Sequence, residues 1–328
     1  MMGHYYIGVD LGGTNIKTSV FNDGFKKVAE MRMATRVQLG SERVLKRMLT
    51  SIIDLLSQAH LQRKQIQAIG IGVPGLLDVK RGISRFSPNF PSWHEVPMAD
   101  WFQKQLHIPT FIDNDVRVNL YGEWYFGAGK GKKNIVLLTL GTGLGAGIVI
   151  DGRVLYGATR SAGEIGHMNM YRSGGRPCRC GSSGCLGRYV SALGMLRTFK
   201  EKLQAGEKSV ITEWVNHDPQ KITAQMISVA YDQDDPAAVR TMNETGELLG
   251  YGLVNIINLY NPELIIIGGG MSAAGDRLLE PARAVVADHA LEISRQACSI
   301  RVAKLGDAAG MLGAAIYAKE RLIYHRKL

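Results

Sequence analysis

The sequence lacks the features of a membrane or secreted protein. It has no uninterrupted apolar run of membrane-spanning length, and Met1-Met2-Gly3-His4 leads straight into a β-prone stretch instead of a signal peptide. We therefore expect a cytoplasmic protein without a membrane partner. Its 328 residues exceed what one compact core usually accommodates, which predicts two domains.

The sequence also lacks a basic stripe interleaved with aromatic residues. Its formal charge of +10 raises nucleic acid as a candidate partner. However, the basic residues are scattered in short groups, and no segment precedes the first expected strand in which a DNA-reading helix pair could lie. We therefore expect no nucleic-acid partner and interpret the charge as a solvated surface that also attracts phosphorylated metabolites.

Cysteine is scarce, and three of the four residues lie within eight positions, at Cys178, Cys180 and Cys185. Such crowding favours metal binding over disulfide bonds in a chain of cytosolic character. With His167 upstream, one imidazole and three thiolates make the Cys₃His set that Zn²⁺ takes tetrahedrally. No coordination position is left open, so we predict a structural zinc, with a reduced metal-free cluster as the alternative. Cys298 is expected to be a buried thiol.

Glycine, in contrast, is abundant at 39 residues, and its first cluster lies within Asp10-Leu11-Gly12-Gly13-Thr14-Asn15-Ile16-Lys17. The flanking alternation predicts a strand, a glycine turn and a strand, unlike the strand-loop-helix of a P-loop. Backbone N–H groups of such a turn can converge on an anion. Asp10 could hold Mg²⁺ through water, and Lys17 could reach a phosphate oxygen. An ordinary hairpin is the alternative.

The same pattern returns at residues 134–150, where Gly141-Thr142-Gly143 separates two apolar segments. Two such hairpins predict duplicated halves that close on one phosphate chain, with two unrelated turns as the alternative. A third cluster, Gly268-Gly269-Gly270, follows the apolar strand expected at 263–267. It permits close approach of a flat ligand such as a nucleoside.

A polar group, Asp113-Asn114-Asp115, follows the strand expected at 109–113. Asn114 can cap a helix over 116–126, and Asp115 then lies in the first turn, where the helix dipole keeps a carboxylate ionised. Strand ends of α/β sheets are where ligands bind. Asp115 is therefore the candidate base for phosphoryl transfer, although capping alone would account for Asn114.

The remaining pattern predicts further elements. We expect a helix over 41–60 capped by Ser41, a buried strand at 66–73, and a long functional loop at 84–101. Late in the chain we expect helices over 244–259 and 308–323.

Taken in order, these motifs resemble the ROK family, which covers repressors, uncharacterised open reading frames and sugar kinases. The resemblance rests on Asp10 to Thr14, Asn114-Asp115, Leu140 to Gly145, Glu164-x-x-His167 and the cysteine knuckle at 178–185. It implies an α/β, actin-like or ribonuclease-H-like duplicated fold, with ATP and a sugar in a cleft between two domains. We expect a small domain of residues 1–118 plus 309–328 and a large domain of residues 119–308.

The resemblance also implies roles for individual residues. The phosphates would lie near Asp10, Gly12, Gly13, Thr14, Asn15, Lys17, Gly141, Thr142 and Gly143, and adenosine near Gly268, Gly269 and Gly270. The sugar would be held by Asn114, Asp115, Glu164 and His167, with Gly75 and Asn89 as weaker assignments. His167 would bind zinc through one ring nitrogen, together with Cys178, Cys180 and Cys185, and a sugar hydroxyl through the other.

The implied activity is ATP-dependent phosphorylation of a hexose at its 6-hydroxyl, with catalytic Mg²⁺ and structural Zn²⁺, and glucokinase is the leading interpretation. The alternatives are a kinase for an amino, N-acyl or C1-substituted hexose and a sugar-responsive regulator. An actin- or chaperone-like ATPase would not need Glu164, His167 and the knuckle. Family members are commonly homodimers or homotetramers, and the donor could be ATP or polyphosphate.

Two departures from the family pattern bear on the substrate. Arg117 stands where many members have Asn or Ala, and Gly187 stands where most sugar kinases have Glu.

Overall fold

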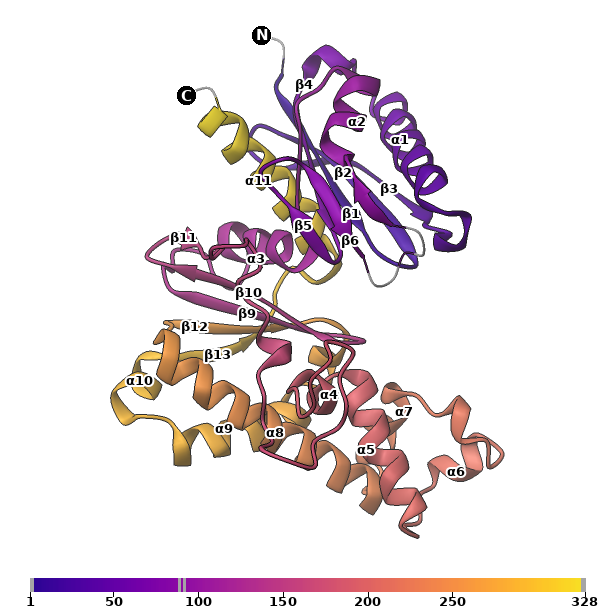
Figure 1. Ribbon diagram of the computed structural model, residues 1–328, viewed down its shortest axis with the longest axis vertical. Coiled ribbons are helices and arrows are strands. Elements are labelled where there is room, and N and C mark those ends of the chain that lie inside the picture. Colours follow the sequence, from indigo (N-terminus) through magenta and orange to yellow (C-terminus); the bar gives the residue numbers. More distant parts are fainter. Residues whose placement is uncertain (1–2, 88–89, 91–92, 326–328) are drawn as a thin grey trace. The chain divides into compact units, whose positions relative to one another are not determined.

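The computed structural model describes residues 3–87, 90 and 93–325, and the chain forms two compact units (Figure 1). Unit 1 comprises the described residues up to Gly131, the segment Tyr156–Ala162 and the chain from Lys304 onward. Unit 2 comprises Lys132–Leu155 and Gly163–Ala303. The structure thus divides the chain after Gly131, whereas the expected boundary after residue 118 falls inside a helix.

Unit 1 is built on a five-stranded sheet in the order β3-β2-β1-β4-β8. The strands are β1 (Tyr5–Leu11), β2 (Asn15–Asn22), β3 (Lys27–Ala34), β4 (Ile66–Val73) and β8 (Thr110–Asn114). The first three pair antiparallel, and β4 and β8 continue the sheet in parallel. The parallel register places the carboxyl ends of β1, β4 and β8 at one edge.

Helices cover both faces of this sheet. In β2, Thr18 bonds Ser51 of α1 (Ser41–Gln58), and the next residue, Ser19, bonds Met311 of α11 (Ala309–His325). Successive side chains of a strand point to opposite faces, so α1 and α11 pack on opposite sides. Helix α3 (Asp115–Phe126) packs along α11, and α2 (Met98–Leu106) contacts β8.

Helix α11 approaches the sheet very closely because glycine faces it. A Cβ on Gly8 or on Gly70 would lie 1.8 Å from a carbonyl oxygen of α11, that of Met311 or of Ala314. Only glycine permits this contact. The last helix of the chain is thereby fixed to β1 and β4.

Unit 2 repeats the same strand order, β11-β10-β9-β12-β13. Its strands are β9 (Ile135–Leu140), β10 (Leu144–Ile150), β11 (Arg153–Val154), β12 (Leu264–Gly268) and β13 (Ser299–Val302). In each sheet the third, second and first strands are antiparallel neighbours and the fourth and fifth add in parallel. This is the duplicated ribonuclease-H-like α/β topology predicted from the resemblance.

The helices of unit 2 are α4 (Gly187–Val190), α5 (Ala192–Gln204), α6 (Ile211–Trp214), α7 (Ala224–Tyr231), α8 (Pro236–Tyr260), α9 (Asp276–His289) and α10 (Glu292–Ala297). All of them except α10 contribute buried residues to one apolar core. Within the described ranges, no helix is both long enough and apolar enough to cross a bilayer.

Three local predictions are corrected. Ser41 begins α1 but does not cap it, because Gly40 occupies the N-cap position and no side chain bonds there. The loop expected at 84–101 instead carries β6 (Ile83–Phe86), β7 (His94–Val96) and the start of α2. Strand β6 pairs antiparallel with β5 (Leu76–Asp78) on one side and with β7 on the other. Helix α8 begins eight residues before the expected position 244.

Candidate functional site

The first glycine turn connects β1 and β2, as predicted. The Gly12 N–H donates to the Asn15 carbonyl at 2.9 Å, and Thr35 braces the turn by donating through Oγ1 to the Gly12 carbonyl at 2.6 Å. Gly13 and Thr14 at the tip are exposed. A backbone hydrogen bond within the turn and the Thr35 side chain therefore fix the base of the turn, while its tip is exposed to solvent. A turn that binds an anion needs such an exposed tip.

A group of carboxylates lies at the carboxyl edge of the unit 1 sheet. Asp10 is near the end of β1, Asp115 begins α3, and Asp307 pairs with Lys17 at 3.0 Å. Burial and the nearby Asp115 charge raise the pKa of Asp10 to about 6, while Lys17 opposes the shift. The larger part of this rise comes from burial, and the charges of Asp115 and Asp307 add to it. Oxygen ligands of this kind fit Mg²⁺.

The junction of β8 and α3 confirms the prediction for Asn114. Its Oδ1 accepts the Val116 N–H at 3.0 Å, which caps α3, and its Nδ2 donates to the Gly75 carbonyl at 3.3 Å. Gly75 has a φ of 99°, and a Cβ there would lie 2.2 Å from the Phe86 carbonyl oxygen. Asn114, Asp115 and Gly75 thus meet at one edge of unit 1, whereas Asn89 lies outside the described residues.

The second glycine turn, in unit 2, borders a cavity of about 700 Å³. Gly141 and Thr142 line it, and so does Gly270 of the third glycine cluster. Gly268 and Gly269 do not line it; Gly269, with a φ of 80°, packs against Leu140 instead. The remaining lining is mainly apolar and comes from α5, α7 and the segment before α9: Ala192, Met195, Ala224, Gln225, Ser228, Val229, Asp232, Met271, Ala273, Ala274 and Arg277.

Sequence reasoning missed these helical residues because no glycine or charge pattern marks them. Asp232 and Arg277 form a two-pronged ion pair, with both N···O distances at 2.7 Å, which joins the end of α7 to the start of α9. A mainly apolar cavity with a few polar groups beside a glycine turn can hold the flat base and ribose of a nucleoside.

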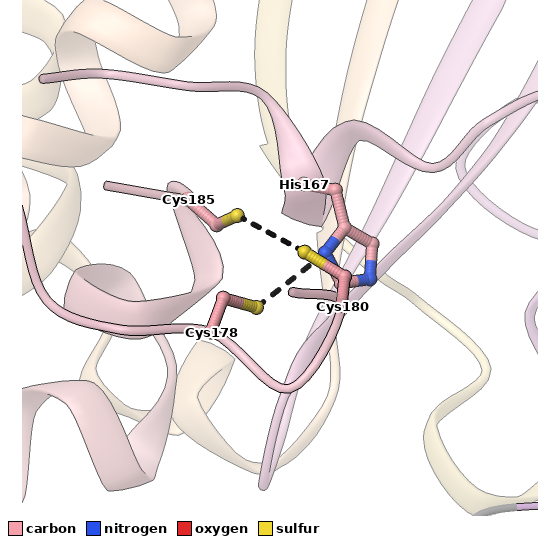
Figure 2. Close-up of side chains that lie close together, drawn as sticks. All are labelled: His167, Cys178, Cys180 and Cys185. Atoms are coloured by element: carbon pink, nitrogen blue, oxygen red, sulfur yellow. Dashed lines mark hydrogen bonds between the residues drawn. The ribbon is translucent and has the colours of Figure 1, made fainter. Parts of the chain in front are cut away.

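The predicted metal ligands come together in unit 2 (Figure 2). The ligand atoms of His167, Cys178, Cys180 and Cys185 all lie within 4.8 Å of one another. Cys178 Sγ is 3.6 Å from His167 Nδ1, and Cys180 Sγ is 3.7 Å from Cys185 Sγ. Tetrahedral zinc with bonds of about 2.0–2.3 Å separates its ligands by about 3.4–3.8 Å. The donor set and its spacing therefore fit Zn²⁺.

The ring of His167 divides its two nitrogens between two neighbours. Nδ1 faces Cys178, whereas Nε2 lies 3.9 Å from Glu164 Oε2. His167 and Glu164 are both exposed, with side-chain exposures of 47% and 60%. A zinc bound at Nδ1 would fix the ring and leave Nε2 directed to the side of Glu164.

The two departures from the family pattern have different structural settings. Gly187 begins α4, and a Cβ there would lie 3.2 Å from the Gly166 carbonyl oxygen. Arg117 is buried in α3 and pairs with Asp113, its Nε donating to Oδ1 at 2.6 Å. Arg117 is therefore committed to a partner within unit 1.

Comparisons with known proteins show what the chain as a whole is similar to. The model of the ROK family matches residues 6–321. A glucokinase from Halalkalibacterium halodurans is 34% identical over 98% of this chain and 97% of its own length. A xylose repressor from Caldicellulosiruptor bescii is 31% identical over 94% of this chain and 76% of its own. The crystal structure of a ROK family glucokinase from Streptomyces griseus, in complex with glucose and AMPPNP, is 31% identical and covers 96% of this chain and 99% of that one, with a TM-score of 0.81.

Proposed function

The chain belongs to the ROK family, and from this premise we propose that it is an ATP-dependent hexose kinase that phosphorylates glucose at the 6-hydroxyl. The observation that carries the proposal is the edge of the unit 1 sheet. There Asp115 follows the Asn114 cap and lies near enough to Asp10 to raise the pKa of that carboxyl. The glucose- and AMPPNP-bound relative supports both substrates.

In the proposed reaction Asp115 accepts the proton of the attacking sugar hydroxyl, because phosphoryl transfer needs a positioned carboxylate for this step. Asn114 and Gly75 would fix sugar hydroxyls beside it, and Glu164 with His167 Nε2 would bind others. The N–H groups of the two glycine turns would hold the phosphates. Mg²⁺, held near Asp10, would supply the charge neutralisation that the transferring phosphoryl group needs.

The cavity in unit 2 favours a nucleotide over polyphosphate as donor. Its lining is mainly apolar, with Met195, Met271 and Ala274 among the residues around it. A base and ribose can bury apolar surface there, whereas a polyphosphate chain has none to bury. We therefore propose ATP as the donor, its adenosine in this cavity and its phosphates at the Gly141–Gly143 turn.

Zinc is proposed as a structural ion held by the Cys₃His cluster, since the four ligand atoms leave no open coordination position. We also expect a homodimer or homotetramer in the cytoplasm. A sugar-responsive regulator is the second candidate, because the xylose repressor is related over most of this chain. An unshifted band with promoter DNA in a gel-shift experiment would remove that candidate.

The test is a coupled assay over a panel of free hexoses, amino and N-acyl sugars and glycosides, with the wild type and Asp115→Asn. We expect glucose to be phosphorylated and Asp115→Asn to lower kcat by about 100-fold or more, as for loss of a positioned base. Nucleotide binding, measured by calorimetry, should be retained.

Asp100→Asn is the matched control, because Asp100 is an exposed aspartate in the first turn of another helix of unit 1. It should turn over like the wild type. Near-normal turnover by folded Asp115→Asn would show that the base is assigned wrongly.

A further inference from the structure

A polar network centred on the buried carboxylate of Asp113 lies close to the proposed base in the sequence. The Asp113 carboxylate is fully buried and accepts three hydrogen bonds. Arg117 Nε donates to Oδ1 at 2.6 Å, the Asn114 N–H donates to the same oxygen at 2.7 Å, and the Tyr156 hydroxyl donates to Oδ2 at 2.6 Å. Asp113 precedes the proposed base by two residues and Arg117 follows it by two, so the ion pair brackets Asp115 across the start of α3.

Two members of this network, Arg117 and Tyr156, have shifted pKa values. Burial lowers the pKa of Arg117, but the Asp113 carboxylate outweighs this effect and raises it above the ordinary value. Burial and the same carboxylate raise the pKa of Tyr156, so its hydroxyl stays protonated and donates. The guanidinium of Arg117 also lies 5.2 Å from the centre of the Tyr156 ring. Each of the three side chains, Asp113, Arg117 and Tyr156, therefore contacts the other two.

Stability alone is a weak reason for such a set. Taking two charges out of water costs about as much as their attraction returns, so buried ion pairs are often no more stabilising than apolar residues of the same size. In some proteins a buried ion pair instead favours one backbone conformation over its alternatives. Here that conformation is the turn from β8 into α3, which carries Asn114 and Asp115.

Tyr156 extends the network to a separate part of the chain. It begins the segment Tyr156–Ala162, which belongs to unit 1 although the chain on both sides of it belongs to unit 2. Arg160 lies 5.4 Å from the centre of the Tyr156 ring, and the Ala162 N–H donates to the Tyr156 carbonyl at 3.0 Å. The segment is thus folded around Tyr156, and the chain then continues directly into Gly163, Glu164 and His167.

We propose that Tyr156 and Arg117, acting through the buried Asp113 carboxylate, are positioning residues that hold the proposed base Asp115 in its productive orientation. This inference rests on the proposed function. Among the three hydrogen bonds to the Asp113 carboxylate from described residues, the Tyr156 bond comes from a distant part of the sequence. It therefore connects the strand end to the segment that leads into the proposed sugar ligands Glu164 and His167.

The experiment measures kcat, KM and equilibrium ligand binding for Tyr156→Phe, which removes one hydroxyl and keeps the ring. We expect kcat for glucose to fall about tenfold, because small misplacements of a reacting group cost one to two orders of magnitude in rate. Dissociation constants for glucose and for a non-hydrolysable ATP analogue should stay within about twofold. A purely structural role would instead lower the melting temperature and leave kcat per folded molecule unchanged.

Tyr121→Phe is the matched control. Tyr121 is a buried tyrosine of unit 1, whereas Tyr156 is partly buried. The Tyr121 hydroxyl lies 3.5 Å from the Tyr156 hydroxyl, and the hydrogen bonds to Asp113 come from other residues. It should keep kcat within about twofold. A second pair of variants, Arg117→Lys and Arg117→Met, tests the ion pair between Arg117 and Asp113. Lysine keeps a cation for Asp113 and should retain more of kcat than methionine does.

Two results would overturn the inference: a normal kcat in Tyr156→Phe, or an equal loss of kcat in Tyr121→Phe. Asp115→Asn in the same assay separates this failure from failure of the proposed function. If Asp115→Asn is inactive while Tyr156→Phe is fully active, only the positioning role is wrong. If Asp115→Asn remains active, the base itself is wrong.

Discussion

Gly187 shows how one residue can set the chemistry of a sugar site. It begins α4, two positions after the buried Cys185, and its Cβ position lies close to the Gly166 carbonyl, next to His167 in sequence. The family resemblance implies a Glu at this position in most sugar kinases, and such a Glu would reach hydroxyls on the anomeric side of the sugar. Glycine offers no acceptor, so one hydrogen bond to a charged group is missing, which is typically worth about 1.5–3 kcal/mol.

We therefore expect free glucose to bind about ten- to a hundredfold more weakly than in a Glu-bearing relative. Gly187→Glu should lower KM for glucose and reduce the use of 1- and 2-substituted sugars, as measured by steady-state kinetics on both sugar classes. Gly187→Ala is the control for the tight contact of 3.2 Å that any Cβ makes with Gly166. The wild type could instead have a low KM for glucose and strongly prefer it, while Gly187→Glu gains nothing. That result would show that Gly187 does not leave room for a substituent on the anomeric side of the sugar.

Single residues also show where sequence reasoning works. The cap formed by Asn114 was predictable because its chemistry is local, a side-chain oxygen bonding an N–H two residues on. Asp113, the partner of Arg117, is also near in sequence. However, the sequence pattern did not distinguish a buried ion pair from a solvent-exposed one. Tyr156 could not be predicted at all, because its bond to Asp113 spans 43 positions.

Among the elements, the cysteine knuckle depends on more than its metal ligands. Arg176, two residues before Cys178, is almost fully buried, and its guanidinium donates to the carbonyls of Arg188 and Gly194 and to Thr198 and Glu201. These bonds tie the knuckle to α4 and α5. The hydrogen bonds of Arg176 therefore stabilise the knuckle at one point, and the proposed zinc would stabilise it at a second.

We expect one zinc per chain, and Cys180→Ser should lose the metal, part of the stability and most of the activity together. The physical reason is that metal-binding free energy at a structural site contributes directly to folding. Elemental analysis, thermal melting and the coupled assay on the same preparation measure the three effects. Cys298→Ser is the control, because this half-buried cysteine lies outside the cluster. Metal-replete protein without zinc would refute the assignment.

Elements with a strong local signal were predictable, and those that form by tertiary contact were not. The strands β1, β4, β9, β10 and β12 are mainly apolar runs, and β2 alternates apolar and polar residues; all six end in glycine or polar turns. Helices α5 and α7 were not predicted, and together with the segment Gly270–Ala274 they supply most of the lining of the nucleoside cavity. The short strands β5, β6 and β7 pair only with one another and lie in a stretch rich in proline and turn residues.

For the molecule as a whole, the repeated strand–glycine–strand pattern was enough to predict duplication. Duplicated halves were predicted because the first two strands and their turn recur in the sequence. The structure adds that both sheets have the same strand order. The extent of each unit was harder to predict. Unit 1 takes in all of α3 and the segment Tyr156–Ala162, and packing rather than any composition change decides this.

The division into units makes a prediction about nucleotide binding. All residues that line the cavity of about 700 Å³ belong to unit 2, so adenosine should bind there without sugar. We expect a non-hydrolysable ATP analogue to slow amide hydrogen exchange at least about tenfold in segments 224–232 and 270–277, since binding stabilises only the conformations that hold the ligand. Hydrogen–deuterium exchange with mass spectrometry measures this.

Tripolyphosphate should not protect these segments, because it has no apolar surface to bury among Met195, Met271 and Ala274. Ser228→Trp, which fills the cavity from α7, should abolish the protection. Equal protection by tripolyphosphate and the analogue would mean that the cavity is not the adenosine site.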